Sequence, residues 1–523
     1  MADEKKIQAK MGKATRWSAI TEVMAKLVAP VSNMVLARFI SPAAFGIVAV
    51  VNMVLSFAEV FADAGFQKYL VQHEFQDVEE KHKSATVAFW TNIIVSAVLF
   101  TFIVVFRNPI SGFLGSPGNG TPIAVGSVSL FLIAFSSIQM ALFKREFDFK
   151  KLFIIRIFAI LVPFIVTIPL AILKFSYWSL IIGTITTNVL NAILLTIFSK
   201  WKPRFFYSFK LLKEMFSFTF LTMLESLTVW LSLWMDSFII GRYFNDYYRG
   251  LYRNANSMVS SIMALITASI VPVLFAALSR LQNDEKGFNN TFLKTQKLTA
   301  MLVLPMGVGL FIFRELATWI ALGDQWMETA LVLGLNGLMY AFKIIFSDFN
   351  SEVFRAKGKP LLSMLLQIIH LAFLIPLCIF GAKKGFTDLV YMRAITRIQM
   401  MVTSLLFMRF VVKFPVGQIF KRNMPVFVAT AVMGVAAYFL QRAMSDIWWQ
   451  FVAIIICIII YAGILFAFPS TRKVLLSLIK KVYNRFIGFK DRKKLKPVAA
   501  GGQTEMTDSA GEKAEDIKEN EGE

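Results

Sequence analysis

Apolar residues in this chain gather in long runs that short polar segments interrupt, and such runs recur from Trp17 onward. An α-helix needs about 20 apolar residues to cross the hydrocarbon core of a bilayer. By length and apolarity, about fourteen runs qualify as membrane spans. The predicted spans are Trp17–Arg38, Ala43–Gly65, Ser84–Phe106, Pro122–Phe143, Leu152–Leu173, Tyr177–Phe198, Met215–Ile240, Tyr252–Leu274, Leu298–Phe313, Ala330–Phe354, Leu361–Phe380, Leu389–Phe410, Val426–Leu440 and Trp448–Phe468. The pattern therefore predicts an all-α integral membrane protein.

Two stretches far apart in the chain, LARFISPAAFGIV and IGRYFNDYYRGLY, share the same spacing of landmark residues. Arg38 and Arg242 lie 204 positions apart, as do Gly46 and Gly250, and further landmarks match at a shift of 211. These matches predict a duplicated six-helix unit, that is, two pseudo-symmetric six-helix bundles followed by two C-terminal helices. Because six is even, both copies enter the membrane in the same direction, and two such bundles would enclose a cleft.

The predicted organisation has four segments. Residues 1–211 form an N-terminal six-helix lobe, 212–420 a C-terminal six-helix lobe, 421–470 two additional spans, and 471–523 a basic amphipathic segment with a disordered acidic tail. Lys and Arg concentrate in alternate loops, so the positive-inside rule places both termini in the cytoplasm. Since no loop is long enough to fold as a domain, we expect any function to be performed among the helices.

The composition supports a membrane location and argues against several other classes. Hydrophobic residues make up 57% of the 523 residues and charged residues only 17%, against about 25% in soluble proteins. The net charge of +22 resides mainly in short loops, where topology explains it, so no nucleic-acid partner is expected. Cys378, Cys457, His73, His82 and His370 show no ligand or disulfide spacing. We find no catalytic motif, expect no cofactor or metal, and do not expect an enzyme.

Charged residues inside the spans are the candidates for function, because they are costly in a membrane and usually face protein, water or substrate. Arg393 and Arg397 are four positions apart in the twelfth span, hence on one helix face. Two like charges this close need a water-filled cleft, carboxylate partners or an anionic ligand. Internal ion pairs and an anion site both stay open as explanations. A guanidinium binds phosphate with two hydrogen bonds. The candidates for a cationic cleft are Arg38, Arg242, Lys343, Arg393 and Arg397.

Four acids in the spans form a second group of candidates. Glu59 and Asp63 are one helical turn apart, whereas Asp236 and Asp348 lie in the seventh and tenth spans. They could serve as internal partners of the arginines or bind a coupling proton or sodium ion. Arg38 and Arg242 are at predicted outer helix ends, where capping carbonyl groups is an alternative to binding substrate.

Several stretches resemble a known family. VLARFISPAAFGIVAVV, followed by FADAGFQKYLVQ, resembles the opening of bacterial polysaccharide flippases of the Wzx type. They form the polysaccharide-transporter branch of the superfamily that also holds the MATE multidrug exporters and the lipid II flippases. YRGLYRNANSMVSS with VPVLFAALSRLQ, and FRAKGKP, resemble the eighth span with its following loop and the loop after the tenth. The resemblance extends to about Phe468.

The resemblance implies a transporter that moves undecaprenyl-pyrophosphate-linked oligosaccharide across the bacterial inner membrane by alternating access. The products would be O-antigen, capsule or exopolysaccharide. It also implies contact with membrane lipids, a coupling proton or sodium ion as a candidate, and a polysaccharide polymerase and glycosyltransferases as candidate partners. The alternatives are a MATE-like exporter of small cations, which would need an acid-dominated cleft, a lipid II flippase, and a membrane glycosyltransferase or polymerase.

Overall fold

The computed structural model describes residues 24–477 apart from 25, 64 and 445, with only the backbone of 218 and 221. Every regular element in this part of the chain is helical. The first elements are a helix at 26–39, α2 (Pro42–Asp63), α3 (Phe66–Gln72), α4 (Val78–Val105), α5 (Arg107–Phe113), α6 (Gly120–Gly126), α7 (Ser129–Arg145), α8 (Phe149–Val162), η1 (Pro163–Thr167), α9 (Ile168–Ile172) and α10 (Tyr177–Phe198).

The second half of the chain continues in the same way. Its elements are α11 (Phe209–Tyr243), α12 (Asp246–Arg280), α13 (Glu285–Ile312), α14 (Arg314–Ala321), η2 (Asp324–Thr329), α15 (Ala330–Lys343), η3 (Ile344–Asp348), α16 (Phe349–Ala356), α17 (Leu361–Lys384), α18 (Phe386–Leu406), η4 (Phe407–Val411), α19 (Gly417–Ala443) and α20 (Ile447–Ala467). We call the helices from 26–39 to α10 the N-terminal bundle and those from α11 to α18 the C-terminal bundle.

Thirteen helices in the described residues are long and apolar enough to cross a membrane. They match thirteen of the predicted spans. The remaining prediction, Trp17–Arg38, lies partly outside the described residues, and its described part continues as the helix at 26–39. The predicted C-terminal amphipathic segment and acidic tail lie outside them from residue 478 on. The chain is thus a multi-pass, all-α membrane protein.

Capping residues fix the starts of several long helices. Asp77 accepts a hydrogen bond from the amide of Glu80 at the start of α4, at 2.6 Å. Ser208 and Asn245 cap α11 and α12 in the same way. Each cap satisfies an amide that would otherwise lack a partner in the first helical turn. Because capping side chains precede the apolar runs, the helices extend beyond the predicted spans.

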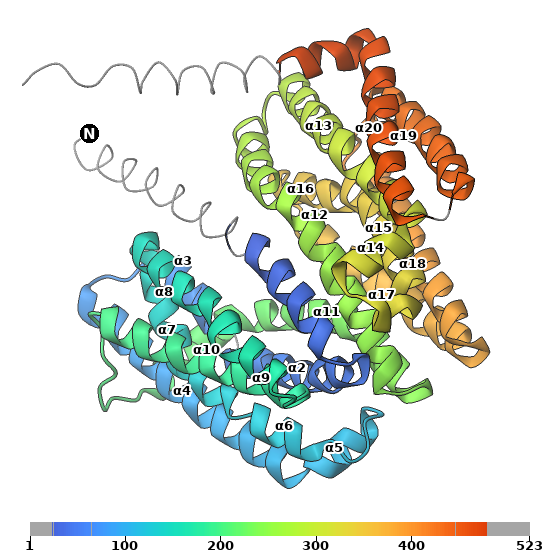
Figure 1. Cartoon of the computed structure of the whole chain (residues 1–523). Helices are drawn as coiled ribbons and strands as arrows, with labels where there is room; N and C mark the ends of the chain where they lie inside the picture. Colours follow the sequence, from blue (N-terminus) through green and yellow to red (C-terminus); the bar gives the residue numbers. More distant parts are fainter. Residues whose placement is uncertain (1–23, 25, 64, 445, 478–523) are drawn as a thin grey trace, which may run out of the picture. The chain divides into compact units, whose positions relative to one another are not determined.

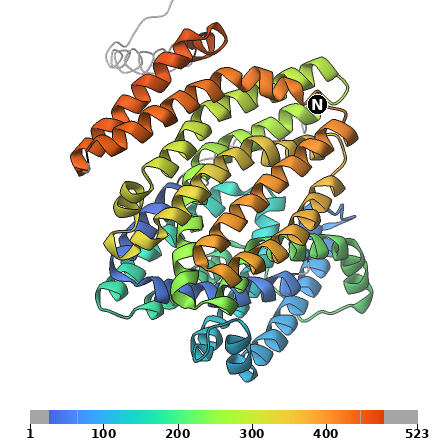
Figure 2. The ribbon, with the colours of Figure 1, turned by 90° about the vertical axis from the view of Figure 1, so that its right-hand side faces the viewer.

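The helices gather in two bundles, which Figure 1 shows as the blue-to-teal elements and the green-to-orange elements. Figure 2, turned by 90°, shows the yellow and orange helices of the C-terminal bundle running side by side. By compactness, the described residues up to Leu465 belong to one unit and those from Phe466 to another. All sites discussed below lie in the first unit.

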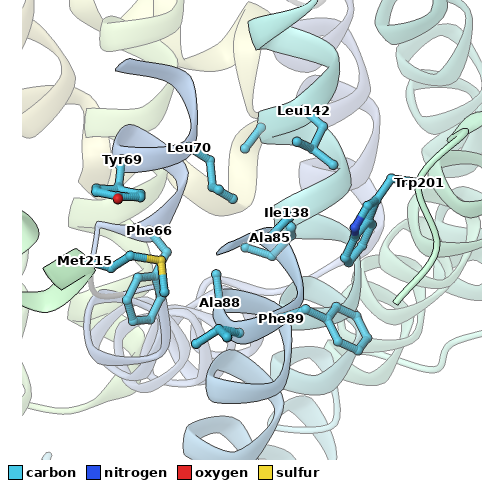
Figure 3. Packing of buried hydrophobic residues seen from close by; sticks show 12 residues of the cluster. Phe66, Tyr69, Leu70, Ala85, Ala88, Phe89, Ile138, Leu142, Trp201 and Met215 are labelled. Carbon is cyan, nitrogen blue, oxygen red and sulfur yellow. The ribbon is translucent and has the colours of Figure 1, made fainter. Parts of the chain in front are cut away.

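A buried apolar cluster holds α3, α4 and α7 of the N-terminal bundle together (Figure 3). Phe66 and Leu70 from α3 pack with Ala85 and Phe89 from α4 and with Ile138 from α7. Trp201 and Met215, from the segments that follow, complete it. Between helices in lipid, van der Waals packing of this kind holds the elements together, and the cluster supports the polar residues on the neighbouring turns.

The repeated sequence pattern marks the place where the two bundles touch. Gly46 in α2 packs so closely against α12 that a Cβ atom there would overlap the carbonyl oxygen of Asp246. Gly250 in α12 packs in the same way against the carbonyl of Pro42. Pro42 and Asp246 are also 204 positions apart. The second contact is therefore the first one with the two copies of the repeat exchanged. The contact is therefore pseudo-symmetric, and glycine is required because only it permits this approach. We call this surface the closed face.

Two loops extend the closed face. Arg249 is fully buried and joins the carboxylate of Asp246, at the start of α12, to the carbonyl of Leu114 in the N-terminal bundle. Asp246 also accepts a hydrogen bond from Ser116 at 2.6 Å and one from Asn119 at 3.2 Å. In the other direction, Gln325 and Trp326 of η2 donate to the carbonyl of Ala37 in the helix at 26–39. Each bundle thus holds a loop of the other.

Candidate functional site

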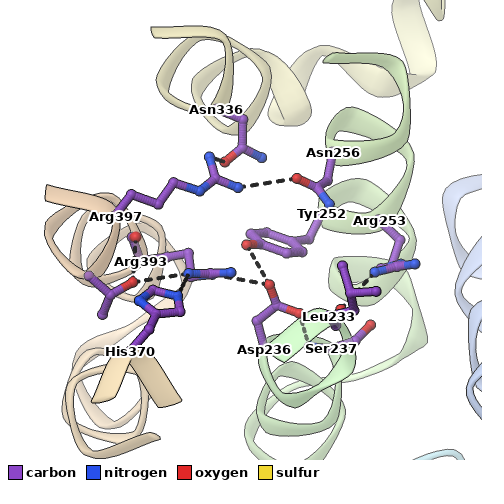
Figure 4. Close-up of polar contacts among 11 residues, drawn as sticks. Leu233, Asp236, Ser237, Tyr252, Arg253, Asn256, Asn336, His370, Arg393 and Arg397 are labelled. Atoms are coloured by element: carbon purple, nitrogen blue, oxygen red, sulfur yellow. Dashed lines mark hydrogen bonds and ion pairs between the residues drawn. The ribbon is translucent and has the colours of Figure 1, made fainter. Parts of the chain in front are cut away.

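A network of polar side chains occupies the interior of the C-terminal bundle (Figure 4). It is built from one face each of α11, α12, α15, α17 and α18, and it borders a pocket of about 100 Å³. The polar residues that line the pocket are Ser232, Asp236, Asn256, Tyr340, Lys343, Gln367, His370, Arg393 and Arg397. Because all of them come from this bundle, the predicted arginine pair points into the C-terminal bundle rather than into a space between the bundles.

Arg393 forms an internal ion pair. Its Nε donates to Asp236 at 3.1 Å, and its Nη1 lies 3.1 Å from both His370 Nε2 and the hydroxyl of Thr396. Since a guanidinium only donates, His370 Nε2 is the acceptor and the imidazole is neutral, with its proton on Nδ1, facing Gln399 at 3.3 Å. The hydroxyl of Tyr252 donates to the same carboxylate at 2.9 Å. Arg393 and Asp236 therefore neutralise each other.

Arg397 has a different environment. It is 4% exposed, and its two terminal nitrogens donate to the amide oxygens of Asn336 at 2.7 Å and Asn256 at 3.2 Å. The guanidinium also lies over the ring of Tyr340, 4.8 Å from its centroid. Among the described residues it is paired with no carboxylate. A buried cation with only neutral partners is costly, and an anionic ligand in the pocket would offset that cost.

Lys343 borders the same pocket and pairs with Asp348 at 2.6 Å. Five positions separate the two residues, a spacing that would point them to different sides of a regular α-helix. The segment between them, η3, is a π-helical turn with hydrogen bonds between residues five apart. The wider turn brings the ammonium and the carboxylate to the same side.

The charges around this pocket do not cancel. Among the described residues, three cationic side chains line the pocket. Arg393 pairs with Asp236 and Lys343 with Asp348, which leaves the positive charge of Arg397 unmatched. The two neutral partners of Arg397, Asn336 and Asn256, present their amide oxygens to it. The arrangement can thus receive an anion, and Arg397 with Lys343 offers it hydrogen-bond donors from two helices.

A larger pocket, of about 370 Å³, lies between the two bundles. Helix 26–39, α8 and α10 line it on one side and α12 on the other. Its polar lining consists of Ser32, Asn33, Arg156, Thr187, Ser257 and Ser261. Asn33 also donates across the bundles to Asn254 at 2.5 Å. Apart from the guanidinium of Arg156, this polar lining consists of hydroxyl and amide groups, which suit a ligand with many hydroxyl groups.

The other predicted residues lie elsewhere. Glu59 and Asp63 line a separate pocket of about 270 Å³, which α2, α3, α4 and α7 of the N-terminal bundle form together with α11. Arg38 donates to the carbonyls of Trp319 and Ile320 at 2.8 and 2.9 Å, so it caps the end of α14. Arg242 is exposed in the last turn of α11. The structure thus brings Arg393, Arg397, Lys343, Asp236 and Asp348 together and places Glu59, Asp63, Arg38 and Arg242 apart from them.

Sequence reasoning missed most of the neutral partners. His370, Asn256 and Asn336 hold the two arginines, and Tyr252 holds Asp236. None belongs to a charged pair, although Tyr252 and Asn256 lie in the quoted stretch YRGLYRNANSMVSS. One signal was present. An amide or imidazole inside an apolar span is itself costly, so it needs a polar partner on a neighbouring helix.

Three curated bacterial proteins are similar to this chain. The succinoglycan biosynthesis transport protein ExoT of Rhizobium meliloti is 25% identical over 322 residues, which cover 62% of this chain and 64% of that protein. The lipopolysaccharide biosynthesis protein WzxC of Escherichia coli is 21% identical, covering 71% and 75%. The teichuronic acid biosynthesis protein TuaB of Bacillus subtilis is 21% identical, covering 73% and 79%.

Solved structures share the fold. The lipid II flippase MurJ, in an inward closed conformation, aligns with a TM-score of 0.71 at 18% identity, covering 88% of this chain and all of that one. An inward-facing multidrug resistance MATE transporter of the MOP superfamily aligns with a TM-score of 0.59 at 12% identity, covering 77% and 99%. The family model described as "Polysaccharide biosynthesis protein" matches residues 35–331. The chain therefore belongs to this family of polysaccharide biosynthesis proteins.

Proposed function

We propose that this protein is a flippase that moves an undecaprenyl-pyrophosphate-linked oligosaccharide across the bacterial inner membrane. The single observation that carries the proposal is the buried guanidinium of Arg397, which faces the pocket of the C-terminal bundle with neutral partners alone. A diphosphate is an anion that a guanidinium fork and an ammonium bind together. The named relatives, which act in succinoglycan, lipopolysaccharide and teichuronic acid biosynthesis, support a saccharide as the rest of the ligand.

Each part of the ligand has a matching surface. The diphosphate would occupy the pocket beside Arg397 and Lys343, while Asp236 keeps Arg393 neutralised and in place. The sugars would lie against the hydroxyl and amide groups of the pocket between the bundles. Ser257 of that pocket directly follows Asn256, a partner of Arg397, so α12 borders both spaces. The isoprenoid tail would remain in the lipid.

Transport requires that the bundles open on alternate sides, and the closed face is the contact that must separate. By the positive-inside pattern of the loops, both termini are cytoplasmic and the closed face is the periplasmic one. The structure would then correspond to the state that accepts substrate from the cytoplasmic side. We propose action in O-antigen, capsule or exopolysaccharide synthesis, next to the glycosyltransferases that build the repeat unit and the polymerase that joins the units.

The competing function, export of small cations, differs in its dependence on the arginine pair. A cation exporter would use acids in its cleft, whereas the pocket of the C-terminal bundle carries a surplus of positive charge. Removal of Arg397 should abolish diphosphate transport, and it should leave export of a cation unaffected or improved, because a like charge is removed.

The experiment is deletion of the protein in its host followed by analysis of lipid-linked intermediates in each leaflet. We expect repeat units to accumulate on the cytoplasmic leaflet, and the wild-type chain to restore their export. The Arg397→Ala variant should not restore it, whereas Arg409→Ala, at an exposed position further along the same helical segment, should. Normal arrival of repeat units outside in the deletion strain would exclude the flippase. Full complementation by Arg397→Ala would remove this residue from the site.

A further inference from the structure

A π-helical turn inside a membrane span places Lys343 at the pocket of the C-terminal bundle. This turn, η3, lies between α15 and α16, and the ion pair of Lys343 and Asp348 depends on its wider geometry. π-helical turns are rare and occur frequently at functional sites. Because such a turn breaks the regular hydrogen bonding of the α-helix, it needs support from outside the helix that contains it.

The π-helical turn takes the usual hydrogen-bond donor away from one backbone carbonyl. In a regular α-helix, the amide of Phe349 would donate to the carbonyl of Ile345, four positions earlier. In η3, this amide donates to the carbonyl of Ile344 instead. Ile345 is fully buried, and a buried acceptor without a donor is costly. The turn is therefore favoured where another donor reaches the carbonyl of Ile345.

Gln296, on the neighbouring helix α13, supplies that donor. Its Nε2 donates to the carbonyl of Ile345 at 2.8 Å, and the residue is fully buried. Its side-chain oxygen accepts from Asn423 of α19 at 3.4 Å, and the same amide nitrogen of Asn423 donates to the carbonyl of Ile419 at 2.8 Å. Since an amide nitrogen only donates, Asn423 orients Gln296 with its nitrogen toward η3. Two helices, α13 and α19, thus hold a donor at the turn.

A second buried amide contacts the next carbonyl of the turn. Asn350 Nδ2 donates to the carbonyl of Phe346 at 2.7 Å and to the hydroxyl of Ser404 at 3.0 Å. Ser404 lies on α18, the helix that also carries Arg397, so the turn is attached to the helix of the unmatched guanidinium. Asn350 belongs to the same span as η3, whereas Gln296 reaches the turn from 49 positions away. Gln296 is therefore the external support of the turn.

We propose that Gln296 is a positioning residue for the pocket of the C-terminal bundle: it holds η3 in its π-helical form and thereby keeps the ammonium of Lys343 beside Asp348. Without this donor, the carbonyl of Ile345 regains a backbone partner when the amide of Phe349 returns to it, which is the α-helical register. Five positions in that register turn through about 500°, so the two charged side chains would point to different sides. The effect on a ligand rests on the proposed function, whereas the form of the turn can be measured without a ligand.

The first test measures the form of the turn by cross-linking. Lys343→Cys and Asp348→Cys are introduced into the full-length chain, in which Cys378→Ala and Cys457→Ala remove the other thiols. A short thiol reagent should bridge the two cysteines across the π-helical turn, and mass spectrometry of the peptides gives the yield. Gln296→Met removes the donor and keeps the length of the side chain. In this variant the yield should fall at least about threefold.

Two further variants complete the cross-linking test. Thr299→Val is the matched control, because Thr299 is fully buried on α13 and its hydroxyl donates within that helix, to the carbonyl of Thr295 at 3.1 Å. This variant should cross-link like the unmodified background. Gln296→Asn keeps an amide that is one methylene too short for the carbonyl of Ile345, so it should show the same fall as Gln296→Met and replaces it if that variant does not fold. An unchanged yield in a folded variant of Gln296 would overturn the proposal.

The second test measures what the turn does for the pocket. A short-chain isoprenyl diphosphate is titrated into the purified full-length protein by calorimetry. In the wild type, Asp348→Asn leaves Lys343 available to the ligand and should tighten binding at least about tenfold. In Gln296→Met the two side chains are already apart, so the same substitution should change affinity less than about threefold. A purely structural Gln296 would lower the unfolding temperature and leave the full gain in place.

The outcomes distinguish this proposal from the proposed function. An equal gain from Asp348→Asn with and without Gln296 would overturn the role of Gln296 at the pocket, whatever the yield of the cross-link. If the diphosphate binds to no variant and not to the wild type, the proposed function fails. The cross-linking yield then decides alone whether Gln296 positions Lys343.

Discussion

Gly46 and Gly250, which are 204 positions apart in the chain, face each other at the contact between the two bundles. Each packs against the backbone at the start of the other's helix, so the two residues make the same contact twice. A duplicated unit that closes on itself must place equivalent residues against each other at its symmetry axis. The shared spacing in the sequence thus reflects the requirement for glycine at both sides of this contact.

The Gly46→Ala variant should separate the closed face. The new methyl group overlaps the carbonyl of Asp246, and overpacking of this kind costs about 1–3 kcal/mol, which lowers the closed population about 5- to 150-fold. Cysteines in place of Phe113 and Phe238, whose rings lie 5.3 Å apart across the bundles, should then cross-link in lower yield with a short thiol reagent. Gly112→Ala is the control, because a Cβ atom there meets open space. Equal yields in both variants would contradict the prediction.

Removal of Asp246 should destabilise the protein by leaving Arg249 without its counter-charge. Arg249 is fully buried, and breaking a buried ion pair from one side costs about 3–5 kcal/mol. The Asp246→Ala variant should therefore unfold at lower temperature in a detergent melt. The double variant Asp246→Ala/Arg249→Met should regain part of the lost stability, because no unpaired charge remains. A double variant less stable than the single one would show that Arg249 acts mainly through its bond to the carbonyl of Leu114.

The two arginines of α18 should differ in their roles: Arg393 should affect stability through its ion pair, and Arg397 should affect export. Asp236→Asn leaves Arg393 buried beside neutral groups and should lower the unfolding temperature, whereas the double variant Asp236→Leu/Arg393→Leu should recover much of it. Arg397→Gln should change stability little, since its partners are neutral amides, but should abolish export of lipid-linked repeat units. Thermal melts and leaflet analysis of the same variants separate the two roles. If Arg397→Gln destabilises as much as Asp236→Asn, Arg397 is a structural residue.

The sequence predicted features that depend on neighbouring positions along the chain. Runs of apolar residues located the helices, because each span must bury about 20 residues in lipid regardless of its neighbours. The spacing of four placed Arg393 and Arg397 on one face, and both side chains are buried as a pair. Pseudo-symmetry was visible in the glycines, since each must remain a glycine to permit close approach.

Partner choice could not be predicted from the sequence. Asp236 pairs with Arg393 from 157 positions away, and Arg38 caps a helix 281 positions further on. Four acids were open as partners of the arginines, and only tertiary packing selects among them. The local rule failed once as well. Lys343 and Asp348 are five positions apart and pair only because η3 is a π-helical turn. No residue pattern in the segment predicted this turn.

The ion pair of Lys343 and Asp348 contributes to the charge around the pocket of the C-terminal bundle. Removing the charge of either partner should therefore change ligand affinity in a direction that can be stated in advance. In Asp348→Asn, the ammonium of Lys343 loses the carboxylate that lies 2.6 Å from it. The surplus of positive charge around the pocket therefore rises. An added charge-assisted hydrogen bond strengthens binding by about 1.5–3 kcal/mol, so a short-chain isoprenyl diphosphate should bind roughly ten- to a hundredfold more tightly in calorimetry.

The opposite change should have the opposite effect. Lys343→Gln should weaken binding of the same diphosphate and flatten its dependence on salt, because one fewer cation takes part. Glu285→Gln, at an exposed acid outside the pocket, should leave affinity unchanged. If all three variants bind the diphosphate like the wild type, Lys343 does not face the ligand, and Arg397 would have to hold the phosphate without it. If Asp348→Asn binds less tightly, the carboxylate must be orienting the ammonium rather than competing for it.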